Sequence, residues 1–103
     1  MKGHKLRFSE QAEADMLGIA EYSLRQWGER QAARYLAGLA ACCGQVADHP
    51  LMGRACSQIL PGLRRIEQGR HVVFFLVAEG DVLIVRVLHN SMQPERWIQG
   101  EEE

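Results

Sequence analysis

The sequence of 103 residues lacks the features that define several large classes of protein. Its longest purely apolar run, residues 72–78, is seven residues long, whereas a membrane-spanning helix needs about 20. No association with a membrane is therefore predicted. The net charge of −1, from 12 Lys and Arg against 13 Asp and Glu, excludes a protein that coats nucleic acid through bulk electrostatics. The length fits one domain, predicted over residues 1–100, with an acidic tail at residues 101–103.

Cysteine is also scarce, because the chain has only Cys42, Cys43 and Cys56. An odd number without a paired framework argues against a disulfide-stapled secreted domain and favours the reducing cytoplasm. A metal site could combine Cys42 or Cys43 with His49 and Cys56, but this spacing matches no zinc pattern. We therefore predict buried free thiols, no metal site and no cofactor.

The first half of the chain has the apolar spacing of helices, preceded by a short strand at residues 5–8. Ser9 is a suitable N-cap for a first helix that runs to about Gln26, and Gly28 ends it. A second helix runs from about Glu29 to Asp48, where His49-Pro50 stops it. Two helices joined at one glycine predict an antiparallel hairpin. Trp27, on the apolar stripe of the first helix, is predicted to lie in the core.

In the second half, after a predicted loop at residues 51–58, the apolar period changes to that of strands. Residues 63–67, 71–77 and 82–88 are the three candidate strands, separated by turn sequences. They predict an antiparallel meander, followed by a short segment that begins at Pro94. The predicted class is α+β: an N-terminal strand, an antiparallel helical hairpin packed on a small antiparallel sheet (β-α-α-β-β-β), and a short C-terminal segment.

No nucleophile motif, phosphate-binding glycine loop or metalloprotease motif occurs. What remains is a basic region, since residues 54–70 contain four arginines against Glu67 alone. Arg86 interrupts an apolar strand, and strict alternation predicts that it faces away from both Val85 and Val87. Such a charge needs either an exposed recognition surface or an acidic partner such as Glu67 or Asp15.

Two further residues near the C-terminus have two interpretations each. His89 belongs either to the same recognition surface or to the structural scaffold. Trp97 either holds the C-terminal segment onto the domain or is an exposed anchor for a partner.

Several short motifs, in order and at compatible spacing, carry a resemblance to a known family. They are Ser9–Asp15 with Ile19 and Tyr22; Trp27-Gly28 with Gln31, Ala32 and Tyr35; His49–Arg54; Gly62-Leu63-Arg64 with Gly69–Phe75; and Arg86–His89 with Met92. Together they cover the chain from about Leu6 to Trp97. The sequence resembles the ParE toxins of the ParE/RelE superfamily of type II toxin–antitoxin systems.

The resemblance implies the same arrangement of a helical hairpin on a small sheet, and it implies a toxin. Toxins of the ParE branch poison DNA gyrase without being nucleases, whereas those of the RelE branch cut messenger RNA on the ribosome. Cleavage of RNA requires basic groups that stabilise phosphate charge and usually a general acid or base. The strand half of this chain has no lysine, and no tyrosine follows Tyr35. We therefore expect a gyrase inhibitor that is not an enzyme.

The alternatives are a RelE-like ribosome-dependent endoribonuclease and a non-toxic binding module of the same fold. The expected partners are gyrase and a ParD-like antitoxin, without sequence-specific binding to nucleic acid. The candidate target-binding residues are Arg64, Arg65, Arg86, His89, Met92 and Trp97. The candidate antitoxin-binding residues are Met16, Ile19 and Ala20 on the first helix.

Overall fold

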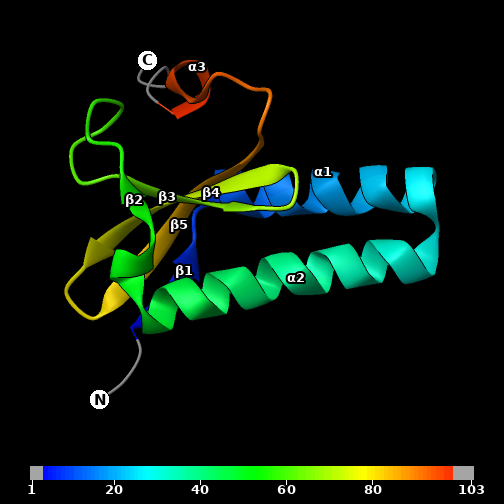
Figure 1. Ribbon diagram of the computed structural model, residues 1–103, viewed down its shortest axis with the longest axis horizontal. Helices are drawn as coiled ribbons and strands as arrows, with labels where there is room; N and C mark the ends of the chain where they lie inside the picture. The colour runs from blue at the N-terminus through cyan, green and yellow to red at the C-terminus, as the bar shows by residue number, and fades with distance from the viewer. Residues whose placement is uncertain (1–3, 99–103) are drawn as a thin grey trace.

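The computed structural model describes residues 4–98, so the predicted acidic tail and the end of the predicted domain lie outside the described residues. The chain forms a sheet, a helical hairpin and a short C-terminal helix (Figure 1). In order, the elements are β1 (Lys5–Phe8), α1 (Glu10–Trp27), α2 (Glu29–Asp48), a 3₁₀ turn (Pro50–Met52), β2 (Arg54–Ala55), β3 (Arg64–Gln68), β4 (His71–Ala78), β5 (Asp81–His89) and α3 (Pro94–Ile98).

The helical hairpin begins and turns at the residues that the sequence indicated. The hydroxyl of Ser9 accepts a hydrogen bond of 2.9 Å from the amide of Ala12 and caps α1. Gly28, with a φ of 86°, is the one residue between α1 and α2. This backbone conformation favours glycine, so a single residue reverses the chain, and the two helices run antiparallel (Figure 1).

The strand order is β1-β5-β4-β3-β2. Strands β3, β4 and β5 form the predicted antiparallel meander, but β1 pairs parallel with β5, so the sheet is mixed and not purely antiparallel. The hairpin of α1 and α2 carries the chain from β1 at one edge of the sheet to β2 at the other. The meander then brings β5 back beside β1, and the two strands point the same way. Within the segment predicted as a loop, two residues form β2 and pair with β3.

The predicted strict alternation around Arg86 is wrong, because β5 contains an irregularity there. Phe74 pairs with Arg86 and Phe75 pairs with Ile84, which leaves Val85 as an extra residue opposite β4. A β-bulge of this kind shifts the alternation by one residue. Val85 and Val87 consequently pack into apolar clusters on opposite faces of the sheet.

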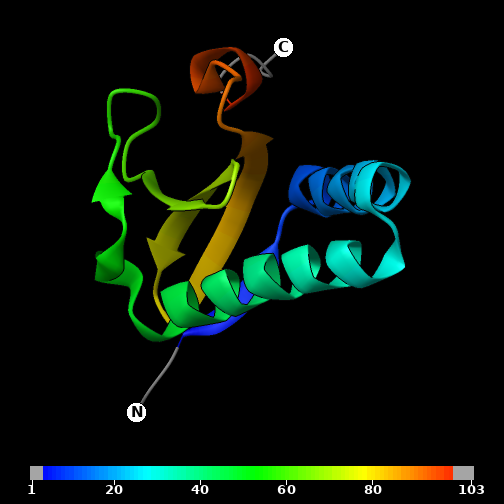
Figure 2. The ribbon, with the colours of Figure 1, turned by 45° about the vertical axis from the view of Figure 1, so that its right-hand side comes forward.

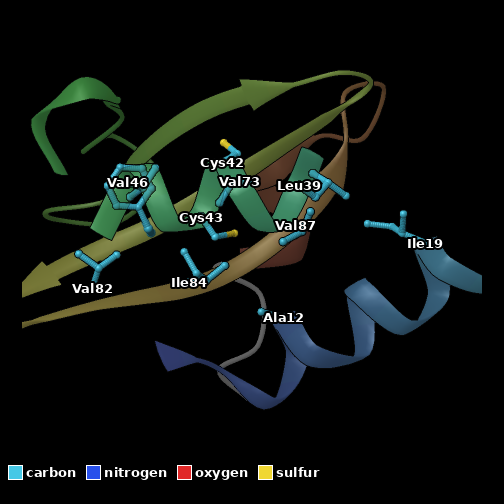
Figure 3. Packing of buried hydrophobic residues seen from close by; sticks show 11 residues of the cluster. Ala12, Ile19, Leu39, Cys42, Cys43, Val46, Val73, Val82, Ile84 and Val87 are labelled. Atoms are coloured by element: carbon cyan, nitrogen blue, oxygen red, sulfur yellow. The ribbon is translucent and has the colours of Figure 1, made fainter. Parts of the chain in front are cut away.

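Both faces of the sheet are covered. One cluster, between the sheet and the helical hairpin, is drawn in Figure 3 and contains Leu39, Cys43 and Val46 of α2 packed against Val73 and Ile84. The other lies beneath α3 and the segment that connects β2 to β3 (Figure 2), and it contains Cys56, Ile59, Leu63, Val72, Phe74, Leu88 and Ile98. This second layer explains why β4 and β5 are apolar on both faces.

Trp27 does not lie in the core as predicted. It is the last residue of α1, and 37% of its surface is exposed. At this end of the hairpin the ring packs edge-on against Tyr35 of α2, with centroids 5.7 Å apart. The apolar periodicity predicted the helix correctly. Trp27 is exposed because it lies at the end of α1, past the part of the helix that the sheet covers.

Two glycine-to-alanine substitutions should change stability in opposite directions. Gly44 lies within α2 and a Cβ there meets nothing within 4 Å, so Gly44→Ala should stabilise by about 0.5–1 kcal/mol. At Gly53 a Cβ would lie 2.8 Å from the backbone oxygen of Arg65 and 2.7 Å from the ring of Phe75. Gly53→Ala should therefore destabilise by about 1–3 kcal/mol. Urea unfolding of both variants measures the difference, and equal effects would contradict the packing described.

Candidate functional site

Arg86, one of the predicted target-binding residues, is held inside the protein by Asp15 of α1. Its Nε and Nη2 donate to the two carboxylate oxygens at 2.9 and 2.8 Å. The two side chains are only 11% and 12% exposed. Of the two roles that the sequence left open for Arg86, the acidic partner is therefore the one that the structure contains.

The position of Asp15 follows from the end of β1. That strand pairs with β5 only as far as Phe8 opposite Ile84, so the next part of the β5 edge needs other partners. The Ser9 hydroxyl donates to the carbonyl of Val85 at 2.8 Å, and the Asp15 carboxylate accepts from the amide of Val87 at 2.8 Å. The start of α1 thus takes the place of a strand.

Trp97 of α3 lies on the other side of the same guanidinium. Nη1 of Arg86 donates to the carbonyl of Trp97 at 2.9 Å, and Arg86 Cζ lies 5.9 Å from the centre of the indole ring. The Trp97 side chain is 46% exposed, whereas the next residue, Ile98, is buried. The backbone and Ile98 attach α3 to the domain, and the indole remains available to a partner.

Met92 connects Trp97 with two other predicted residues. Met92 and Trp97 line an open depression of about 610 Å³, together with Ser91, Gln93 and Arg96. Met92 also lines a small cavity of about 70 Å³ with Arg65 and His89. Trp97, Met92, His89 and Arg65 therefore lie along one surface, which we call the α3 surface.

Arg64 does not belong to the α3 surface. Its Nη2 donates to the carbonyl of Leu51 at 3.3 Å and to that of Gly53, whereas the neighbouring Arg65 lies over the ring of Phe74. Adjacent residues of a strand face opposite sides of the sheet. Arg64 thus holds the 3₁₀ turn and β2 in place on the side away from Arg65.

The predicted antitoxin-binding residues differ in accessibility. Ile19 is buried, with 8% of its surface exposed, while Met16 and Ala20 are half-buried. Ile19 still lines a groove of about 360 Å³ between α1 and the end of β5, beside Tyr22 and Met92. Among the large apolar side chains of α1, Leu17 has the highest exposed fraction, at 62%. The helix therefore presents an apolar surface next to the predicted stripe.

Two residues that the sequence interpretation did not select, Tyr35 and His71, form a cluster with His89. The Tyr35 hydroxyl lies 2.6 Å from Nδ1 of His71 and accepts the amide of Arg70 at 3.0 Å. The rings of His71 and His89 are edge-on, with centroids 5.4 Å apart. Their pairing across β4 and β5 depends on the bulge at Val85, because the register set by the turn alone would place His71 opposite Leu88.

The environment of His71 favours the neutral ring. Burial lowers the pKa of His71, and the nearby His89 lowers it further, while Asp15 raises it to a smaller extent. The Tyr35 hydroxyl accepts the amide of Arg70, and its own proton can go to Nδ1 of a neutral His71 at 2.6 Å or to the carbonyl of Gln68 at 3.4 Å. Protonation of Nδ1 would reverse the contact with His71, so that the hydroxyl accepts from the ring and donates to Gln68.

This lowered pKa predicts a loss of stability in mild acid. As the pH falls, the His71 side chain of the unfolded chain binds a proton before that of the folded chain. The stability that the neutral His71 contributes is therefore fully present above its ordinary pKa of 6.5, and it is lost as the pH falls through the lowered folded-state pKa. Urea unfolding at pH 7 and pH 5 should show this decline, and His71→Phe should reduce it. His49→Phe, at the exposed end of α2, should leave the decline as in the parent; an equal reduction there would contradict the assignment to His71.

The three cysteines are buried free thiols, as predicted. Burial raises the pKa of the Cys43 thiol to about 11, and the neighbouring Cys42 adds to the shift. A thiol in this state is a weak nucleophile at neutral pH.

Across residues 4–98, His, Cys, Asp and Glu form no group of three that could hold a metal ion. In the same part of the chain, no helix is both long and apolar enough to cross a bilayer.

Comparison with known proteins identifies the family. The profile described as "ParE toxin of type II toxin-antitoxin system, parDE" matches residues 6–94. The chain belongs to the ParE toxin family. It is 44% identical to Toxin ParE1 of Caulobacter vibrioides over 86 residues, which cover 84% of this chain and 88% of that protein. It is 38% identical to Toxin ParE1 of Mycobacterium tuberculosis over 82% of this chain and 88% of that protein.

Solved structures agree with this membership at the level of the fold. A chain from the structure titled "Chromosomal ParDE TA system from P. aeruginosa" superposes with a TM-score of 0.72, at 18% identity, over 84% of this chain and 95% of that chain. The toxin–antitoxin complex RelBE2 of M. tuberculosis gives a TM-score of 0.68 at 21% identity, over 89% and 97% of the two chains. The ParE-type fold is thus shared with a complex named for the RelE branch, so the fold alone does not separate the two branches.

Proposed function

We propose that this ParE-family toxin inhibits DNA gyrase by binding to it through the α3 surface, without catalysing a reaction of its own. Family membership supports a toxin of a type II system. Gyrase is the expected target because the chain resembles the ParE branch and not the RelE branch. The α3 surface offers an exposed indole beside Met92 and an open depression. Exposed aromatic side chains of this kind are frequent anchors of protein–protein interfaces.

The observation that carries this proposal is the buried pair of Arg86 and Asp15. A ribonuclease of the RelE type needs basic groups directed at a phosphate and usually a general acid or base beside them. Arg86, the single arginine of β4 and β5, is instead neutralised by a carboxylate, and both side chains are almost enclosed. Arg64 donates to the carbonyl of Gly53, and Arg65 pairs with the exposed carboxylate of Glu67. This arrangement favours binding over cleavage of RNA.

We also propose a ParD-like antitoxin as the partner that neutralises the toxin. Its support is the family description, which names the parDE pair, and the relation in fold to a ParDE system and a RelBE complex. The groove beside Ile19 and the exposed Leu17 offer apolar contacts to a segment that folds on binding. Met16, Ile19 and Ala20 stay the predicted contacts, with Ile19 reached only through that groove.

A supercoiling assay with purified gyrase tests the proposal. The toxin should inhibit supercoiling and cause cleaved DNA to accumulate, and it should leave a coupled translation reaction intact. Arrest of translation with messenger cut at the ribosome would instead establish the RelE-like alternative. If the protein affects neither reaction and its expression is harmless, the non-toxic binding module is correct.

A further inference from the structure

A second groove lies between α2 and the turn that joins β3 to β4. It has a volume of about 500 Å³, and its side chains come from both elements and from the end of α1. The six that carry the argument are Trp27, Gln31, Arg34, Tyr35, Gln68 and Arg70. None of the predicted target or antitoxin residues lines this groove.

The two walls of the groove carry matching polar groups. The α2 wall contributes Gln31 and Arg34, and the turn contributes Gln68 and Arg70. Within residues 4–98, neither guanidinium has a carboxylate within ion-pair distance, and neither glutamine amide has a hydrogen-bond partner. No acidic side chain of this part of the chain lines the groove. The groove therefore combines two positive charges with two unused amides.

Arg34 on α2 and Arg70 in the turn differ in this respect from three arginines on the strands. Arg7, Arg54 and Arg65 each lie within 3.3 Å of a carboxylate oxygen. In these three pairs the carboxylate neutralises the arginine, whereas Arg34 and Arg70 have no such partner. The groove is therefore a local positive site on a chain whose net charge is −1.

The floor of the groove is aromatic and its shape is fixed by packing. Trp27 stands edge-on to Tyr35 and is 37% exposed, whereas the Tyr35 hydroxyl is already engaged by the turn. Gly69 has a φ of 61°, and a Cβ there would lie 2.7 Å from the Tyr35 ring. The turn can approach α2 this closely only with glycine, so the distance between the two walls is set by the sequence.

We propose that this groove binds an extended acidic peptide segment of a partner protein. A carboxylate of the segment lies between Arg34 and Arg70, whose planar guanidinium groups bind carboxylates through paired hydrogen bonds. Gln31 and Gln68 bind backbone amides of the segment, because a glutamine amide both donates and accepts. An apolar side chain of the segment packs on Trp27. The proposal goes beyond the proposed function, since it requires neither gyrase nor toxicity.

A peptide fits the groove better than a nucleic acid. The described residues around the groove include no lysine, and the amide of Arg70 in the turn is used by Tyr35. Binding of nucleic acid depends on neutralising many phosphates, and a chain with a net charge of −1 has no overall positive charge for this. A short segment with one or two carboxylates needs only the two arginines.

Titration of the ¹⁵N-labelled full chain with a synthetic peptide, acetyl-Gly-Glu-Leu-Glu-Leu-Gly-amide, tests the inference. The indole N–H resonance of Trp27 should shift and saturate, while that of Trp97, outside the groove, should not. The same peptide with glutamine in place of glutamate should bind at least about fivefold more weakly. Equal binding of the two peptides, or equal shifts of both indoles, would overturn the proposal.

Charge-reversed variants locate the site. Arg34→Glu and Arg70→Glu should each weaken binding of the acidic peptide by about fivefold or more. Arg25→Glu, an equal change of charge near the end of α1 but outside the groove, should stay within about twofold. If Arg25→Glu weakens binding as much, the effect is one of net charge and the groove is not the site. Tighter binding of a thymidine hexanucleotide at Trp27 would assign the groove to nucleic acid instead.

Discussion

Replacing Asp15 by alanine will lower the free energy of unfolding by about 3–5 kcal/mol, the range measured when one partner of a buried ion pair is removed. Three hydrogen bonds converge on this carboxylate: two come from Arg86, and the third comes from the amide of Val87. In Asp15→Ala the guanidinium, at 11% exposure, keeps its charge without this counter-charge. The Val87 amide also loses its acceptor at the edge of β5, where no strand replaces it.

Asp81→Ala is the matched control. Asp81 also pairs with an arginine of a neighbouring element, but the side chains of Arg7 and Asp81 are 61% and 30% exposed. Exposed pairs contribute about 0–1 kcal/mol, so this variant should cost less than about 1 kcal/mol. The double variant Asp15→Leu/Arg86→Met should recover part of the loss, because no charge is then left buried. Urea unfolding measures all three, and an Asp15→Ala variant no less stable than Asp81→Ala would refute the role assigned to the carboxylate.

The role of Arg86 shows where the sequence stops being informative. A charge in an apolar strand required a partner, and both Asp15 and Glu67 were possible. The choice between them depends on where β1 ends and on the bulge at Val85, and both are properties of the assembled sheet. Glu67 is also engaged by Arg54 and Arg65 at 3.3 and 3.2 Å. Local periodicity carries no signal for either fact.

Elements whose limits depend on local chemistry were predicted well. The cap at Ser9, the glycine between the helices and the proline after α2 act on neighbouring backbone atoms, so the sequence is sufficient to place them. The parallel pairing of β1 with β5 joins residues 76 positions apart, as for Lys5 opposite Asp81. The prediction of an antiparallel sheet therefore applied only to the meander, where consecutive strands are joined by short turns.

The candidate site was predicted in part for the same reason. Met92 and Trp97 are close in sequence and share one depression. Arg64 and Arg65 are adjacent, yet the alternation of a strand separates them, and Arg64 is used to hold the 3₁₀ turn. Tyr35 and His71 were missed because 36 residues separate them, and only the packing of α2 against the turn brings them into contact.

Replacing Trp97 by alanine should weaken inhibition of gyrase by about 2 kcal/mol, or roughly 30-fold in the concentration that gives half-inhibition. The indole is 46% exposed at the rim of the depression that it shares with Met92. Tryptophan is among the residues that most often dominate an interface, because one side chain buries a large apolar area. Its backbone carbonyl still accepts from Arg86 in the variant, and Ile98 still anchors α3 in the apolar cluster.

Trp27→Ala supplies the comparison that separates target binding from loss of fold. Trp27 is similarly exposed but lies at the junction of α1 and α2. It lines a small cavity with His89, but it does not line the depression that Trp97 shares with Met92. Its removal should leave the inhibition of gyrase within about twofold, although it takes an edge contact from Tyr35. Thermal unfolding of both variants establishes that each is folded at the assay temperature. If Trp97→Ala inhibits supercoiling as strongly as the parent while Trp27→Ala does not, the gyrase contact belongs to the hairpin end of the molecule and not to α3.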